Sequence, residues 1–201
     1  YGQALTNIVY MGMGEPLLNY ANVLKSIEQI TSPEGLGMSP RRITVSTAGI
    51  AKMIKKLGDD QVKFNLALSL HAANDTKRNQ IMPINESNTL QVLKAALLYF
   101  FEKTGNEITL EYIVFNKFND TIEDARELYE FAKGIPCKIN LIEYNPIAQS
   151  SFVNAEADAI AKFSAFLESK RMIVNIRRSR GRDIDAACGQ LAGKKAPVVD
   201  A

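Results

Sequence analysis

The sequence contains no tryptophan, only one histidine and only two cysteines among its 201 residues. The two cysteines, Cys137 and Cys188, are too few for a disulfide framework and lack the spacing of a metal site. His71 is the single histidine, and no nucleophile-elbow motif accompanies it, which argues against a Ser–His–Asp triad. The low cysteine content favours a reducing compartment, so we expect a cytoplasmic protein.

Long apolar runs and a strong net charge are absent as well. No segment is long enough to span a bilayer, and no signal peptide is recognisable. The net charge of +2 does not by itself indicate nucleic-acid binding, so local basic clusters must carry that argument. The composition, 46% hydrophobic and 23% charged, is that of a globular domain with a sizeable core. Because the chain starts with Tyr1 rather than Met, we expect a fragment or a processed product.

Apolar segments rich in β-formers alternate with helical patterns along the chain. The predicted strands cover residues 6–14, 42–47, 64–72, 107–115, 137–146 and 171–177. The predicted helices cover residues 19–30, 50–57, 89–103, 120–133 and 155–169, with Asn88 as an N-cap and Asp120 with Glu123 as a capping box. This alternation predicts the α/β class, with a parallel sheet that forms either a doubly wound sheet or a complete or partial (β/α) barrel.

Small and polar residues follow the predicted strands, whose carboxyl ends converge on one face in either architecture. In GMGEP, Gly12 and Gly14 let the backbone approach a ligand, and Glu15 offers a carboxylate for an ammonium group. A tight turn with Glu15 as a capping acid explains the motif equally well. Neutral hydrogen-bonding groups that suit a ribose or a carboxylate come from Ser46, Ser69, His71 and Asn145. Ordinary turn capping is the alternative for each of them taken alone.

Arginines are clustered in two segments of the sequence. The first contains Arg41 and Arg42, and the second contains Arg177, Arg178, Arg180 and Arg182. Arginine suits phosphate binding and base stacking, and a solvated edge paired with nearby aspartates is the alternative. Cys137 begins a predicted strand and is expected to be an inert, half-buried residue. Cys188 stands among small residues, which makes it a possible nucleophile.

Taken in order, six motifs resemble one family: MGMGEPL, RRITVSTAG, LALSLHA, MPIN, CKINLIEYNP and RGRDIDAACGQLAG. They resemble the radical S-adenosylmethionine methyltransferases that modify carbon 2 of adenine in 23S ribosomal RNA and, in many members, in transfer RNA. The resemblance runs from about Asn7 to Gly193. It implies a TIM-like partial (β/α)6 barrel in residues 1–193, with a carboxyl-terminal catalytic-cysteine segment, and a tail in residues 194–201.

The resemblance also implies roles for single residues. Gly14 and Glu15 would bind the methionyl amino group of S-adenosylmethionine, and the rest of that site would be lined by Ser46, Ser69, Leu70, His71 and Asn145. Cys188 would carry a methyl group as S-methylcysteine, from which a 5′-deoxyadenosyl radical formed at a [4Fe–4S] cluster abstracts hydrogen. The arginines would grip RNA phosphates, and flavodoxin or ferredoxin would supply electrons.

The sequence departs from the family in lacking the CxxxCxxC motif that binds the cluster and the cysteine that resolves the protein–RNA link. We therefore expect a fragment that lacks the amino-terminal domain, the cluster loop and the first barrel strand. Such a fragment would be inactive alone and would leave an unpaired strand edge at residues 7–10. Three alternatives stay open: a carbon-8 adenine methyltransferase that confers antibiotic resistance, a barrel lyase or hydrolase that uses His71 and Glu15, and a non-catalytic RNA-binding module that uses the arginines.

Overall fold

A computed structural model describes residues 4–145 and 151–177 of the chain. Its single sheet has six strands in the order β1-β2-β3-β4-β5-β6, and every neighbouring pair is parallel. The strands are β1 (Ile8–Tyr10), β2 (Ile43–Thr47), β3 (Asn65–Ser69), β4 (Ile108–Val114), β5 (Cys137–Glu143) and β6 (Ile173–Arg177). Within the described ranges β1 and β6 have one partner each, so the sheet is an open, partial (β/α) barrel. The expected α/β fold is confirmed, and β1 has the expected unpaired edge.

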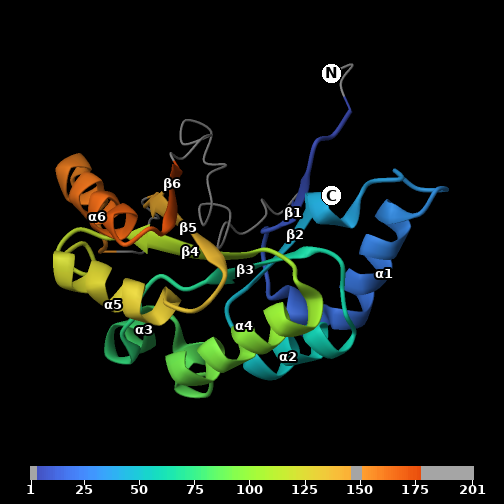
Figure 1. Ribbon diagram of the computed structural model, residues 1–201, viewed down its shortest axis with the longest axis horizontal. Coiled ribbons are helices and arrows are strands. Elements are labelled where there is room, and N and C mark those ends of the chain that lie inside the picture. Colours follow the sequence, from blue (N-terminus) through green and yellow to red (C-terminus); the bar gives the residue numbers. More distant parts are fainter. Residues whose placement is uncertain (1–3, 146–150, 178–201) are drawn as a thin grey trace, which may run out of the picture.

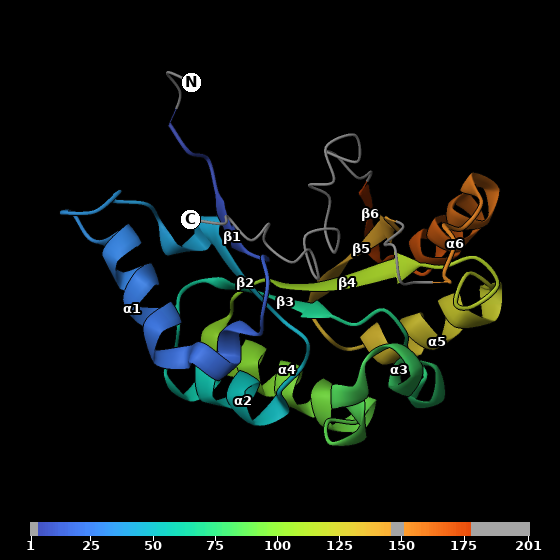
Figure 2. The same cartoon turned by 180° about the vertical axis from the view of Figure 1, so that it is seen from behind.

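Helices connect the strands and cover one face of the sheet (Figures 1 and 2). The α-helices are α1 (Tyr20–Thr31), α2 (Ala51–Asp59), α3 (Asp75–Ile81), α4 (Leu90–Thr104), α5 (Ile122–Ala132) and α6 (Ala157–Ser169). Short 3-10 helices are η1 (Pro16–Asn19), η2 (Pro40–Arg42) and η3 (Pro83–Glu86). Between residues 4 and 177, the described parts contain no helix that is long and apolar enough to cross a membrane.

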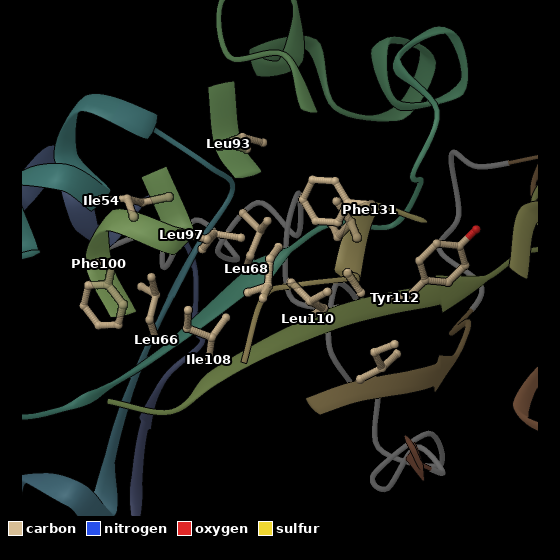
Figure 3. Close-up of a cluster of buried hydrophobic side chains, with 14 of the residues drawn as sticks. Ile54, Leu66, Leu68, Leu93, Leu97, Phe100, Ile108, Leu110, Tyr112 and Phe131 are labelled. Atoms are coloured by element: carbon tan, nitrogen blue, oxygen red, sulfur yellow. The ribbon is translucent and has the colours of Figure 1, made fainter. Parts of the chain in front are cut away.

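The core lies between the sheet and these helices. Alternate residues of the strands, such as Leu66, Leu68 and Leu110, are fully buried against Leu97 and Phe100 of α4 (Figure 3). Because side chains alternate across a strand, the residues between them face the opposite, inner side of the sheet. In both views no described helix covers the middle of that inner side (Figures 1 and 2).

Two predicted helix caps are wrong, and the structure shows what the residues do instead. Asn88 does not cap α4, because its Oδ1 accepts a hydrogen bond from the N–H of Ala51 at the start of α2, at 2.9 Å. The capping box of α5 lies one residue later than predicted and joins Thr121 to Asp124. Asp120 instead accepts from the N–H of Lys117 in the preceding turn, at 3.1 Å. Asn88 therefore links two elements that are distant in the sequence, which local pattern reading cannot show.

Candidate functional site

A row of polar side chains crosses the inner face of the sheet, one from each of five strands. Register pairs Ser69 with Glu111, Glu111 with Asn140, and Asn140 with Asn175. The hydroxyls of Ser46 and Ser69 lie 3.4 Å apart, which extends the row to β2. We call these five residues the inner-face row. Ser46, Ser69 and Asn175 are partly or fully exposed on this face, whereas Glu111 and Asn140 are buried, and the row as a whole is a candidate ligand site.

The GMGEP loop lies next to this row at the carboxyl edge of the sheet. Gly14 has a φ of +86°, a conformation that favours glycine, and nothing lies within 4 Å of the position where a Cβ would stand. Both carboxylate oxygens of Glu15 accept backbone N–H bonds, Oε1 from Leu17 at 3.0 Å and Oε2 from Ala48 at 2.7 Å. Glu15 is thus the N-cap of η1 and also joins the loop after β1 to the loop after β2. Each oxygen keeps a further lone pair, so an ammonium group can still bind.

His71 follows β3 and has a φ of +56°, in the left-handed region. Its Nδ1 accepts the N–H of Ile113 at 3.2 Å, and its carbonyl accepts from Asn119 Nδ2 at 2.7 Å. Burial, with a further contribution from the positive charge of Arg78, lowers the pKa of His71 to about 4. The imidazole is therefore neutral near pH 7, and Nε2 is the nitrogen that carries the proton.

Leu70 and Asn145 are the other two residues expected at the site. The side chain of Leu70 is fully buried in the helix-facing core, so only its backbone is near the site. That backbone is engaged on both sides, since its N–H donates to Glu111 O at 2.9 Å and its carbonyl accepts from Arg78 Nε at 3.1 Å. Asn145 is 5% exposed and follows β5 at the same edge of the sheet.

Arg78 of α3 is a central residue of this edge that the sequence analysis missed. It is fully buried, and its guanidinium donates to three carbonyls at the ends of β2 and β3, those of Ala48 (2.7 Å), Ser69 (3.2 Å) and Leu70 (3.1 Å). Its Nη1 donates to Asn85 Oδ1 at 2.7 Å, and Asn85 in turn donates to Asp75 at 2.8 Å. Burial lowers the pKa of Arg78 to about 10, so it stays charged at neutral pH. The MPIN motif, which contains Asn85, was the available signal.

Two further groups order the loops after β4 and β5. Asn119 is fully buried and accepts the N–H of Phe115 at 2.7 Å while donating to the carbonyls of His71 and Ile113. An aromatic cluster packs beside it with ring centroids 4.5 to 6.1 Å apart, and it consists of Phe115, Phe118, Tyr144 and Phe152. The segment of residues 118–120, which follows β4, therefore fixes the position of the loop that carries His71.

The predicted arginines divide between the two edges of the sheet. Arg177 ends β6 at the carboxyl edge, and its Nη1 lies 3.6 Å from Glu111 Oε1. Arg41 and Arg42 lie in η2, before β2, and thus at the opposite edge. The remaining three, Arg178, Arg180 and Arg182, lie outside the described residues, as does Cys188. Cys137 is half-buried, and burial raises the pKa of its thiol to about 12, which agrees with the expected inert role.

The described residues fit S-adenosylmethionine better than they fit an iron–sulfur cluster. The Gly14–Glu15 loop, the paired serines and the inner-face row offer carboxylate and hydroxyl groups for an ammonium group and a ribose. In contrast, residues 4–145 and 151–177 contain no group of three His, Cys, Asp or Glu side chains that could hold a metal ion. The whole chain has two cysteines, one fewer than the CxxxCxxC motif supplies, so it does not hold the cluster by itself.

Comparison with known proteins agrees with this fold. A scan against protein-family models finds no match. The crystal structure of a radical SAM methyltransferase from Sphaerobacter thermophilus superposes with a TM-score of 0.91 at 38% identity, and covers 94% of this chain and 55% of that one. The open parallel barrel thus has the fold of the matched part of a radical S-adenosylmethionine methyltransferase.

Curated relatives narrow this class further. The chain is 66% identical to the probable dual-specificity RNA methyltransferase RlmN of Cytophaga hutchinsonii over 195 residues, or 97% of this chain and 53% of the relative. It is 57% identical to the protein of the same name from Christiangramia forsetii, over 98% of this chain and 56% of the relative. The chain belongs to the RlmN family and spans about half the length of these curated relatives.

Proposed function

We propose that this chain is the S-adenosylmethionine-binding part of an RNA methyltransferase that methylates carbon 2 of adenine. The observation that carries the proposal is the joining of Glu15, Ala48 and the Ser46–Ser69 pair at one strand edge. These groups come from three separate loops or strands, which is the arrangement that an extended ligand with an amino acid and a ribose requires. The 66% identity to a probable RlmN protein supports the choice of reaction.

The residues of this chain bind and orient the ligand. Glu15 and the exposed backbone of Gly12–Gly14 would hold the methionyl ammonium group, while Ser46, Ser69 and Asn145 would bind hydroxyl and carboxylate groups. The backbone of Leu70 and the neutral His71 would close the same site, with Nε2–H of His71 as a donor. When it is bound in an intact enzyme, S-adenosylmethionine supplies the methyl group and, together with a [4Fe–4S] cluster, radical chemistry.

Cys188 would carry the methyl group to the RNA. Carbon 2 of adenine is electron-poor and bears no acidic proton, so a simple transfer of a methyl cation to it fails. A carbon tethered to a cysteine sulfur avoids that obstacle, and the sequence neighbours Ala186, Ala187 and Gly189 are all small residues. Residues 1–193 would then form the barrel core with the catalytic-cysteine segment, and residues 194–201 a tail.

The substrates and partners follow from the same proposal. We infer 23S ribosomal RNA and also transfer RNA as substrates, with flavodoxin or ferredoxin as electron donor and the cytoplasm as location. Arg177 lies at the edge of the candidate site, so it is the described arginine best placed to contact a phosphate near the reacting adenine. Arg41 and Arg42, at the opposite edge, would contact only a more distant part of a large RNA.

The structure gives no support to the lyase or hydrolase alternative. A pKa of about 4 makes His71 a weak base at neutral pH, and both carboxylate oxygens of Glu15 are already engaged by backbone N–H groups. The carbon-8 methyltransferase differs in its product, so mass spectrometry of the modified nucleoside distinguishes it from the proposed function.

The decisive experiment maps the methyl group on the protein. The enzyme containing this chain, or the chain completed with the unmatched part of the Cytophaga hutchinsonii relative, is purified anaerobically and its cysteine peptides are weighed. We expect one added methyl group on Cys188 and none on Cys137, with Cys188→Ser inactive and Cys137→Ser active as its matched control. An active, iron-loaded enzyme whose Cys188 is never methylated would overturn the proposal.

A further inference from the structure

A buried carboxyl group in the middle of the inner-face row has one oxygen without a hydrogen-bond partner in the described part of the chain. Glu111 is 5% exposed, and its Oε1 accepts from Asn140 Nδ2 at 2.8 Å and lies 3.6 Å from Arg177 Nη1. Its Oε2 is buried and has no hydrogen-bond partner among the described residues. A buried carboxylate oxygen without a donor is costly, so such an atom calls for an explanation.

Packing does not supply that explanation. Glu111 stands on the inner face, while its strand neighbours Leu110 and Tyr112 fill the helix-facing core. Burial raises the pKa of Glu111, although Asn140 and Arg177 act against that shift. An apolar residue of similar size at this position would avoid the cost of burying a carboxyl group. The strand instead keeps a carboxyl group and orients it through Asn140, whose Oδ1 is in turn held by Asn175 at 3.1 Å.

The neighbours of Glu111 indicate the kind of molecule that would complete it. Register places Glu111 directly beside Ser69, whose hydroxyl lies 3.4 Å from that of Ser46. The free oxygen is therefore one strand away from the groups that the proposed function assigns to an adenosyl ligand. Adenosine carries several donors that suit a carboxylate, namely the ribose hydroxyls and the amino group of the base.

We propose that Glu111 is an additional ligand-binding residue whose Oε2 accepts a hydrogen bond from a hydroxyl or amino group of an adenosine. The inference rests on the proposed function, because that function brings two adenosines to this face: the adenosyl group of S-adenosylmethionine and the target nucleotide of the RNA. Asn140 and Arg177 are positioning residues in this arrangement, since they hold Oε1 and thereby direct Oε2 toward the ligand.

The test compares Glu111→Gln with a matched control, the same substitution at a glutamate just before strand β4. Glu107→Gln is the control, because Glu107 precedes β4, is 50% exposed and pairs with Lys138 away from the site. The probes are 5′-deoxyadenosine and a short RNA hairpin with one unpaired adenine, each titrated into the protein and followed by NMR. Circular dichroism checks that each variant is folded, and Glu111→Asp, which withdraws the carboxylate by one methylene, replaces the glutamine variant if that one is not.

We expect the Glu111 variant to weaken binding of at least one probe about tenfold, which is the scale of one hydrogen bond to a charged group, while Glu107→Gln leaves both affinities unchanged. A loss confined to 5′-deoxyadenosine assigns Glu111 to the cofactor, and a loss confined to the hairpin assigns it to the target. Unchanged affinity for both probes would overturn the inference and leave the proposed function intact. If the wild-type protein binds neither probe at millimolar concentration, the proposed function itself fails.

Discussion

His71 shows how a residue expected to bind a ligand is also fixed by the fold. Its backbone has a left-handed conformation just after β3. Its Nδ1 accepts the hydrogen bond from the N–H of Ile113 that a backbone carbonyl of a neighbouring strand would otherwise accept. The hydrogen bond from Ile113 requires an unprotonated Nδ1, because a protonated imidazole has no acceptor. Burial and the nearby charge of Arg78 lower the pKa of His71 in the same direction, which keeps Nδ1 unprotonated at neutral pH.

This lowered pKa predicts acid sensitivity. An unfolded histidine titrates near 6.5, whereas folded His71 titrates near 4, so the unfolded state binds the proton first as the pH falls. The contribution of His71 to stability is therefore complete above pH 6.5 and is lost progressively between pH 6.5 and 4, by up to about 3 kcal/mol. Urea unfolding of the wild type at pH 7.5, 6, 5 and 4 measures this loss.

His71→Asn is the matched variant, since asparagine tolerates the left-handed backbone and does not titrate. Its free energy of unfolding is expected to be lower than that of the wild type at pH 7.5 but to fall less between pH 6.5 and 4. An equal acid dependence in the two proteins would show that other groups cause the loss.

At the scale of elements, Arg78 holds the loops of the candidate site together. It binds the carbonyl of Ala48, whose N–H is bound by Glu15, and it also binds the carbonyls of Ser69 and Leu70. One side chain of α3 therefore connects the loops after β1, β2 and β3. Lysine cannot reproduce this, because an ammonium group lacks the planar fork that reaches several carbonyls at once.

We predict that Arg78→Lys and Arg78→Met lower the free energy of unfolding by about 3 kcal/mol or more, because each leaves buried carbonyls and Asn85 without donors. Urea denaturation measures the loss. Gln80→Met, on the exposed side of the same helix, is the control and should change stability by less than about 0.5 kcal/mol. A lysine variant as stable as the wild type would mean that water or a shifted backbone satisfies these carbonyls.

Arg78 and Glu111 show how much of the candidate site could be predicted from the sequence. The six strands and the α/β class could be predicted, because alternating hydrophobic patterns report local structure directly. The GMGEP loop and the two serines could be placed at one edge, since parallel strands force their ends together. Arg78 was not placed, because three of its partners are backbone carbonyls, which leave no trace in the sequence, and Asn85 of MPIN is its one side-chain partner among the described residues. Glu111 did leave a signal, as the one carboxylate inside the otherwise apolar or neutral strand β4.

At the scale of the whole molecule, the chain contains the candidate ligand site but lacks the thiols for a [4Fe–4S] cluster. A [4Fe–4S] cluster needs at least three cysteine thiolates from the motif of this family, and the chain has two cysteines. One of them, Cys137, is half-buried at the start of β5, at the edge opposite to the site, and has a pKa of about 12. At neutral pH its thiolate fraction is therefore negligible.

We predict that anaerobic reconstitution of this chain with iron and sulfide yields no stable cluster, measured as iron and sulfide per protein and as absorbance near 400 nm after desalting. The chain completed with the unmatched part of the Cytophaga hutchinsonii relative should instead hold about four irons, and Cys137→Ser should leave that value unchanged because the buried thiol is not a ligand. If the chain alone retained about four irons after desalting, then side chains other than cysteine would have to bind the cluster. In that event the separation of ligand site and cluster loop between two parts of the protein would be wrong.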